Sequence, residues 1–294
     1  MTILKVQNLK KYFGKTKAVD GISFEVSKGE IFGFLGPNGA GKTTTIRCMM
    51  DFIRPTSGSI KILDKDAQKD SEFLKSKIGY LPGSVKLYDG WTGHDHIAFL
   101  ESIRGQSQNL PELISKLDFN PKIKFKTLST GNKQKLGLIL SLMSEPEVLI
   151  MDEPTVGLDP LLQSTIYDIL ENLNKKGTTI FMSSHNLSEV ERLCSRVGII
   201  KNGKIIALEE IENLGKKRMH AVEVHFAGSF NKDKFQAGNI EIVQELPDGL
   251  ILNVRGDINP LVRQLADYPL KDLEITHASL EEVFLEFYQD GGRK

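Results

Sequence analysis

The strongest signal in the sequence lies at residues 36 to 44, Gly36-Pro37-Asn38-Gly39-Ala40-Gly41-Lys42-Thr43-Thr44. It follows a short apolar run, Ile31–Leu35, that is typical of a buried strand, and a helix is predicted from Thr43 to about Met50. Glycines allow backbone N–H groups to turn inward around phosphate oxygens, and the following helix presents its positive end there. Lys42 can then reach the β- and γ-phosphates of a nucleotide, while the Thr43 hydroxyl can bind Mg²⁺. The pattern predicts a phosphate-binding loop, with a chance glycine turn as the alternative.

A second signal is a buried strand that ends in two acids. The apolar run Val148–Met151 is followed directly by Asp152 and Glu153. Such a strand is common and usually structural when it stands alone, but its position downstream of Lys42 makes the pair specific. We expect Asp152 to hold the Mg²⁺ shell and Glu153 to polarise the attacking water as general base.

A third signal is the start of an amphipathic helix in the middle of the chain. Ser129 or Thr130 can cap this helix, which is predicted from Asn132 to Met143. A helix N-terminus is also a site where anions bind. The residues alone therefore allow a plain helix cap or an anion-binding end.

Taken in order, the motifs of about the first 210 residues resemble those of the ABC ATPase family. The resemblance rests on the phosphate loop, the Asp152-Glu153 strand and three further motifs: Ser129-Thr130-Gly131 followed by Gln134, the turn Gly157-Leu158-Asp159-Pro160, and His185 after Ser183-Ser184. It implies an α/β fold, a P-loop NTPase core with an antiparallel β subdomain and a helical insertion. It also implies ATP and Mg²⁺ as cofactors and ATP hydrolysis as the activity.

The resemblance further implies that two ATPase subunits face each other head to tail with ATP between them. Residues 36–44 would bind ATP, and Ser129 and Gly131 would contact the γ-phosphate bound by the partner. Asp159 would line the seam, and His185 would contact the γ-phosphate and sense its departure. Tyr12 resembles the aromatic platform for adenine, a stacking contact of about 1–3 kcal/mol per base. A histidine at a helix start and a core tyrosine are the alternatives for His185 and Tyr12.

One position departs from the family pattern. After the strand Ile78–Leu81 and Pro82, the family usually has a glutamine that helps to coordinate Mg²⁺, whereas this chain has Gly83. We therefore expect weaker metal positioning and slow hydrolysis by the isolated subunit.

Two neighbouring features allow both a functional and a structural interpretation. His94 and His96 resemble a metal pair, but Thr92 with Asp95 fits a helix capping box at the start of a helix predicted over Thr92–Arg104. Leu87, Tyr88 and Trp91 either pack locally or form the groove in which the family binds a coupling helix of its membrane partner.

The domain organisation follows from the order of predicted elements. Residues 1–215 are expected to form the ATP-binding domain, with a helical subdomain at about 84–145, and residues 216–294 a small α+β accessory domain. Asn213–Arg218 is predicted to be a linker, followed by a split βαβ arrangement with a turn at Pro247-Asp248-Gly249. A last helix is predicted to carry the apolar stripe Leu280, Val283, Phe284 and Phe287, and residues 278–285 resemble the tail of export-type subunits that have separate permeases.

Composition limits the remaining choices. Lys and Arg number 38, as do Asp and Glu, so no net charge points to nucleic acid. Cys48 and Cys194 lack metal-type spacing and are expected to be reduced.

No apolar stretch reaches the roughly 20 residues that span a bilayer, and the N-terminus does not resemble a signal peptide. We therefore expect a subunit that is soluble when isolated, and the family resemblance implies that a polytopic permease holds it at the cytoplasmic face of the membrane. A second subunit, identical or related, would complete the dimer. The alternatives are a soluble ABC ATPase acting on ribosomes or nucleic acid, and a nucleotide-binding regulator without turnover.

Overall fold

A mostly parallel sheet forms the centre of the structure. The computed structural model describes residues 1–216, 219–235 and 238–277, and the chain folds as two compact units, one at Met1–Leu208 and another from Glu209 onward. The central sheet has the strand order β10-β9-β3-β8-β7-β6. Its strands are β3 (Ile31–Leu35), β6 (Ile78–Leu81), β7 (Val148–Asp152), β8 (Thr179–Ser184), β9 (Arg196–Lys201) and β10 (Lys204–Glu210).

Five of these strands run parallel, so their carboxyl ends meet at one edge of the sheet. β3 pairs with β8 and β9, and β7 pairs with β6 and β8, all in parallel. The register places Leu35 opposite Ser184 and Asp152 opposite Ser183. The loops that follow β3, β7 and β8 therefore lie side by side at the edge where open α/β sheets bind their ligands.

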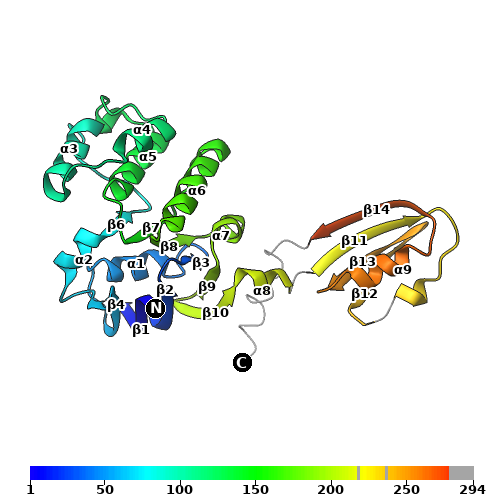
Figure 1. The fold of residues 1–294 in the computed structure, drawn as a ribbon. Coiled ribbons are helices and arrows are strands. Elements are labelled where there is room, and N and C mark those ends of the chain that lie inside the picture. Colours follow the sequence, from blue (N-terminus) through cyan, green and yellow to red (C-terminus); the bar gives the residue numbers. More distant parts are fainter. Residues whose placement is uncertain (217–218, 236–237, 278–294) are drawn as a thin grey trace. The chain divides into compact units, whose positions relative to one another are not determined.

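Helices connect the strands of this sheet (Figure 1). They are α1 (Lys42–Met49), α2 (Ser71–Lys77), α6 (Pro160–Lys175) and α7 (Leu187–Leu193). The two-residue turn Asn202-Gly203 joins β9 to β10 with positive φ angles of 50° and 76°, as predicted for a hairpin.

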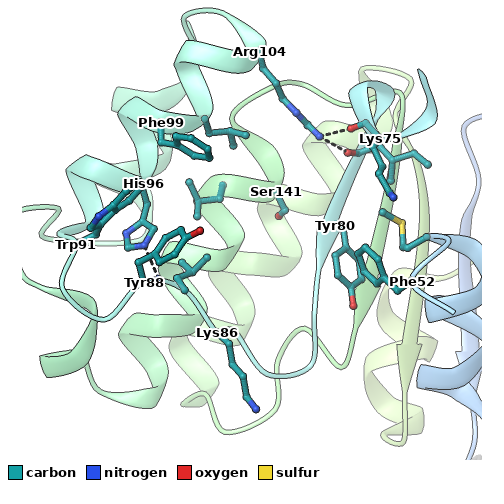
Figure 2. Close-up of a pocket in the computed structure, with 15 residues that line it drawn as sticks. Phe52, Lys75, Tyr80, Lys86, Tyr88, Trp91, His96, Phe99, Arg104 and Ser141 are labelled. Atoms are coloured by element: carbon teal, nitrogen blue, oxygen red, sulfur yellow. Dashed lines mark hydrogen bonds between the residues drawn. The ribbon is translucent and has the colours of Figure 1, made fainter. Parts of the chain in front are cut away.

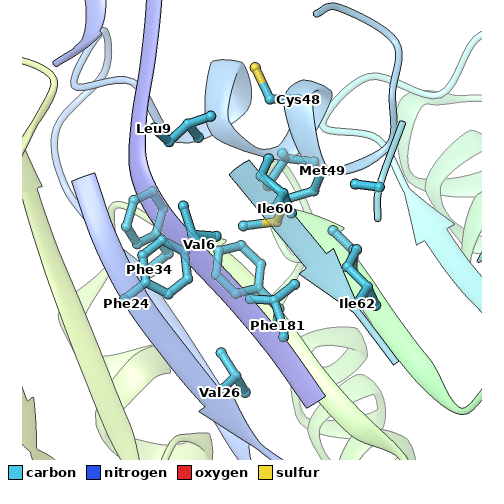
Figure 3. Packing of buried hydrophobic residues seen from close by; sticks show 14 of the residues in the cluster. Val6, Leu9, Phe24, Val26, Phe34, Cys48, Met49, Ile60, Ile62 and Phe181 are labelled. Atoms are coloured by element: carbon cyan, nitrogen blue, oxygen red, sulfur yellow. The ribbon is translucent and has the colours of Figure 1, made fainter. Parts of the chain in front are cut away.

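A second, antiparallel sheet packs against the central sheet. It contains β1 (Thr2–Phe13), β2 (Thr16–Ser27), β4 (Ser57–Ile62) and β5 (Lys65–Asp66), in the order β2-β1-β4-β5. Figure 3 shows aromatic and aliphatic side chains filling the space between this sheet, the central sheet and α1. Phe24 stacks on Phe32, Phe34 and Phe181 with ring centroids 5.4–5.8 Å apart. This packing fixes the two sheets against each other behind the phosphate loop.

A helical segment is inserted between β6 and β7. It contains α3 (Gly93–Arg104), α4 (Leu110–Lys116), the 3₁₀ turn η1 (Phe125–Thr127) and α5 (Thr130–Leu142). The antiparallel sheet, the P-loop core and this insertion confirm the predicted fold class. Two short helices, α2 and α4, were not predicted; each buries a single apolar residue, Leu74 or Leu113, and so has no helical periodicity to detect.

The unit from Glu209 onward begins with α8 (Ile211–Lys216), so the prediction of a linker at this point was wrong for its first residues. Its sheet has the order β12-β13-β11-β14, and every neighbouring pair is antiparallel. The elements are β11 (Met219–Phe226), η2 (Lys232–Phe235), β12 (Ile240–Leu246), β13 (Gly249–Arg255), α9 (Asn259–Leu265) and β14 (Leu270–His277). β14 follows β13 and α9 in the chain but pairs with β11, on the side of β11 away from β13. This order is the split βαβ arrangement that the sequence predicts.

The core of this unit is made by one face of its sheet. Val222, Val224, Leu250 and Leu252 pack with Leu261 of α9, and each is inaccessible to solvent. The predicted last helix and its stripe Leu280, Val283, Phe284 and Phe287 lie outside the described residues, as does the export-type tail. The domain boundary at 215/216 stays a prediction, since the first compact unit ends slightly earlier, at Leu208.

Candidate active site

The backbone of two other strands, β2 and β9, packs closely against the phosphate loop. A Cβ on Gly36 would lie 2.3 Å from the Ile200 carbonyl oxygen, and one on Gly41 would lie 2.5 Å from that of Ala18. Gly41 also has a φ of 114°, which a residue with a side chain adopts only with strain. Glycine is therefore required at both ends of the turn between β3 and α1.

Lys42 lies inside the curve of this loop. Its ammonium donates to the carbonyl oxygens of Gly36 at 2.6 Å and Pro37 at 3.2 Å, and only 5% of the residue is exposed. The same ammonium lies 3.1 Å from the Glu153 carboxylate. The loop thus holds a buried positive charge where the strand and helix geometry predicts a phosphate.

Glu153 joins Lys42 to His185. Its other carboxylate oxygen lies 2.6 Å from His185 Nδ1, so this ring nitrogen carries the proton if the imidazole is neutral. Glu153 has a φ of 53°, an uncommon angle for a non-glycine residue, which turns the chain sharply at the end of β7. The structure therefore brings together Lys42, Glu153 and His185 from three different strand ends.

Asp152 lies beside them and is buried. One of its oxygens accepts a hydrogen bond of 2.6 Å from the Ser183 hydroxyl, and that hydroxyl accepts from the Glu153 N–H at 3.1 Å. A Cβ on Gly83 would lie 3.4 Å from the other Asp152 oxygen. The Thr43 side chain, at the start of α1, is exposed. Gly83 therefore places no side chain against this second Asp152 oxygen.

Ser129 and Gly131 lie at the N-terminal end of α5, away from this cluster. Ser129 is the N-cap of the helix, and its hydroxyl accepts from the Asn132 N–H at 3.3 Å. In the described part of the chain, no hydrogen bond or ion pair joins Ser129 or Gly131 to residues 36–44. Gln134, further along the same helix, donates to the Pro154 carbonyl at 3.0 Å and so ties α5 to the segment after Glu153. The motif alone assigned no such role to Gln134, because its partner is distant in the chain.

Tyr12 and Asp159 occupy the edges of the site. The Tyr12 hydroxyl donates to Asp20 at 2.5 Å, and this bond raises the pKa of Tyr12. Tyr12 on β1 pairs with Lys17 on β2. The next residue, Ala18, has its carbonyl oxygen against Gly41, so these two strands border the phosphate loop. Asp159 is exposed and caps α6 by accepting from the Leu162 N–H at 3.0 Å.

The His94-Asp95-His96 segment is explained by helix capping. Thr92 and Asp95 exchange both bonds of the predicted capping box at the start of α3. His96 is buried, and its two ring nitrogens contact the Thr92 carbonyl and the Tyr88 N–H. Among the described residues, no group of three potential ligands could hold a metal ion, so nothing in that part of the chain completes a site with these histidines.

A groove of about 700 Å³ lies between the helical insertion and the core (Figure 2). Tyr88, Trp91 and Phe99 line one side, and Phe52 and Tyr80 line the other. Tyr88 packs on Trp91 with centroids 4.8 Å apart yet keeps 66% of its surface exposed. Arg104 spans the groove by donating to the Lys75 and Ile78 carbonyls. Leu87, Tyr88 and Trp91 thus line a groove, and binding of a coupling helix there stays a prediction.

The fold and this cluster define a P-loop nucleoside triphosphatase. Residues 19–156 match the family model described as ABC transporter. The chain is 39% identical to the linearmycin resistance ATP-binding protein LnrL of Bacillus subtilis, over 70% of this chain and 68% of that protein. It is 33% identical to the bacitracin transport ATP-binding protein BcrA of Bacillus licheniformis, over 99% and 98% of the two chains.

Solved structures agree with this assignment. The ATP-binding subunit of an ABC transporter superposes with a TM-score of 0.68 and 28% identity, over 72% of this chain and 91% of that one. A cassette bound to ADP and phosphate, 21% identical with a TM-score of 0.65, shares the fold over 71% of this chain and 99% of that one. The chain belongs to the ABC transporter family as an ATP-binding and ATP-hydrolysing subunit. Within the part of the chain that the structure describes, no helix is long and apolar enough to cross a membrane.

Proposed function

We propose that this ATPase drives export of a substrate through separate polytopic permease subunits, at the cytoplasmic face of the membrane. The names of two relatives, one a resistance protein and one a bacitracin transport protein, support removal of a compound from the cell. In this proposal residues 1–215 are the ATP-binding domain, with the helical subdomain at about 84–145, and residues 216–294 are an accessory domain.

The observation that carries the proposal is the contact of one carboxylate, Glu153, with both Lys42 and His185. A triphosphate in the loop would compete with Glu153 and with the Gly36 carbonyl for the Lys42 ammonium. Glu153, released from Lys42, can then accept a proton from the water that attacks the γ-phosphorus. The bond to the β–γ bridging oxygen breaks, giving ADP and phosphate, while His185 can direct its Nδ1–H to a γ-phosphate oxygen in place of the Glu153 carboxylate.

Mg²⁺ fits the residues beside this group. Asp152 provides a carboxylate with one oxygen bonded to Ser183 and the other facing Gly83, and Thr43 provides an exposed hydroxyl. These are the hard oxygen ligands that Mg²⁺ prefers. When bound, the ion neutralises charge on the phosphates, and Asp152 and Thr43 are the residues proposed to hold it.

Dimer formation completes the proposed site. Ser129 and Gly131 are not joined to the loop of their own chain, and the Ser129 helix end is exposed, so it is available to a phosphate held by a second subunit. Asp159, exposed at the start of α6, would line the same seam, and Tyr12 would stack on adenine. The second subunit is either a copy of this chain or a relative.

Glu153→Gln tests this proposal. Loss of a general base should lower kcat for ATP by at least about a hundredfold while ATP still binds, because the amide cannot accept the proton. Trapped ATP should then shift the protein from monomer to dimer in size-exclusion chromatography with light scattering.

Glu153→Gln combined with Ser129→Arg is the matched control, since a bulky side chain at the α5 end should block the dimer and leave the loop of the same chain intact. A Glu153→Gln protein that stays monomeric with Mg-ATP, even beside its permease, contradicts the composite site.

The groove is the proposed docking site of the permease. Its lining is aromatic and carries Lys75, Lys86 and Arg104, and none of the described residues that line it is acidic. Figure 2 shows these cations around the aromatic side chains. An apolar segment of the permease with an acidic residue would therefore complement it, because buried aromatic area supplies affinity and opposite charges set the register.

A further inference from the structure

A buried carboxylate, Glu189 of α7, lies behind the active site and takes no part in the chemistry proposed above. The residue is only 3% exposed. One of its oxygens accepts a hydrogen bond of 2.7 Å from the Thr155 hydroxyl, and the other accepts one of 2.6 Å from the Ser184 hydroxyl. A single carboxylate therefore connects two separate loops.

The two loops are those that carry the reacting groups. Thr155 follows Glu153 by two residues, after the end of β7, and Ser184 directly precedes His185 at the end of β8. Glu153 and His185 are themselves in contact at 2.6 Å. The Ser184 carbonyl also accepts a hydrogen bond from the Gly36 N–H at 3.2 Å, so the end of β8 is joined to the phosphate loop as well.

The surroundings of Glu189 make its burial costly. Both of its hydrogen bonds come from neutral hydroxyls, and none of the ion pairs found among the described residues includes it. Burial raises the pKa of its carboxyl, and the nearby charge of Glu153 acts in the same direction. An apolar side chain would avoid the cost of desolvation but would leave the buried Thr155 hydroxyl without its acceptor, while the Ser184 hydroxyl would keep only the Asn186 carbonyl at 3.2 Å.

We propose that Glu189 is a positioning residue for ATP hydrolysis: by holding the loops after β7 and β8 together, it sets the placement of Glu153 relative to His185. This inference rests on the proposed roles of those two residues. Displacement of a reacting group by about 1 Å can cost a hundredfold in rate, so a fixed spacing matters for turnover more than for nucleotide binding.

The test uses steady-state ATP hydrolysis by the full chain carrying Thr155→Val, Thr155→Ser or Glu189→Gln. Thr155→Val keeps the shape of the side chain and removes one hydroxyl, so kcat should fall about tenfold or more while KM for ATP changes less than about twofold. Thr155→Ser keeps the hydroxyl and should restore kcat. Glu189→Gln should lower kcat similarly. The double variant Glu189→Gln with Thr155→Val should have a kcat no lower than that of the more affected single variant, because both substitutions disrupt the same connection between Glu189 and Thr155.

Thr178→Val is the matched control. Thr178 is also buried and donates to the Pro146 carbonyl at 3.1 Å, but it lies at the opposite end of the sheet. The Thr178→Val substitution should lower thermal stability as much as Thr155→Val does, without lowering kcat. If Thr178→Val lowers kcat equally, or if Thr155→Val keeps the wild-type kcat, Glu189 has a structural role only. Should Glu189→Gln not fold, the Thr155 pair decides alone.

Glu153→Gln measured in parallel separates the two proposals. Loss of turnover in Glu153→Gln together with wild-type kcat in Thr155→Val overturns the positioning role and leaves the proposed function intact. Persistent turnover in Glu153→Gln overturns the proposed function itself, and the positioning role with it.

Discussion

Three residues around the active site, Gly36, Gly41 and Glu153, are constrained by the backbone. Gly36 and Gly41 face carbonyl oxygens at distances that no Cβ tolerates, and Glu153 is held at a positive φ where β7 ends. These positions place Lys42 and Glu153 3.1 Å apart. The charge arrangement of the site therefore depends on a few backbone angles that most side chains would not permit.

Gly83 provides a prediction at this scale. A Cβ there would lie 3.2 Å from the Asp152 carbonyl and 3.4 Å from its carboxylate, so a longer polar side chain would reach the proposed Mg²⁺ ligand with only a small local shift. We expect Gly83→Gln to lower the Mg²⁺ concentration needed for half-maximal hydrolysis and to raise kcat of the isolated subunit several-fold. The measurement is ATPase rate against Mg²⁺ concentration.

Gly83→Ala is the control, because it adds the Cβ contact without an amide oxygen. An equal gain in Gly83→Ala, or wild-type turnover already as fast as that of Gly83→Gln, would show that the missing amide is not what limits hydrolysis.

At the scale of elements, local sequence placed most helices and strands correctly where the burial pattern was strong. The fully buried runs of β3 and β7 and the capped helix α3 matched their predictions within one residue. The missed helices, α2 and α4, each bury one residue and gave no signal. The linker prediction at Asn213–Arg218 was wrong where α8 forms, because a Gly and Lys-rich composition does not by itself prevent a helix.

The capping box of α3 can be tested directly. Thr92 accepts from the Asp95 N–H at 3.1 Å and Asp95 accepts from the Thr92 N–H at 2.8 Å. Thr92→Ala removes the first bond and should lower the free energy of unfolding by about 1 kcal/mol, as measured by urea denaturation. Ser102→Ala, on the same helix but away from its start, should change it by less than about 0.5 kcal/mol. Equal effects of the two substitutions would mean that the cap contributes nothing specific.

At the scale of the whole molecule, function depends on surfaces formed by distant segments. The groove joins residues of α2, β6, α3, α5 and the chain just after α1, and only the fold makes them neighbours. Three aromatic residues of its lining, Phe52, Tyr88 and Phe99, have more than half of their surface exposed.

Tyr88→Ala, or Lys86→Glu, should weaken co-purification of the subunit with its permease from detergent-solubilised membranes, because one removes apolar contact and the other reverses a charge. ATP affinity should stay within about twofold, since neither residue contacts the phosphate loop. Phe73→Ala is the control: Phe73 is an exposed aromatic on α2 that does not line the groove. Unchanged co-purification in both groove variants would remove the groove as the docking site.

The phosphate loop, the acid-ended strand and the capped helices could be predicted from the amino-acid sequence, since each depends on residues close together in the chain. The family could be predicted from the order of such local motifs along the chain. The backbone angles of glycines, the alternation of strand residues and the helix caps are local properties, and they can be predicted without knowing the order of the strands. Three other features are visible only in the folded chain: Glu153 lies between Lys42 and His185, Glu189 connects two loops, and Gly83 faces Asp152. These contacts depend on which strands are neighbours in the sheet, and hydrophobic pattern does not encode that order.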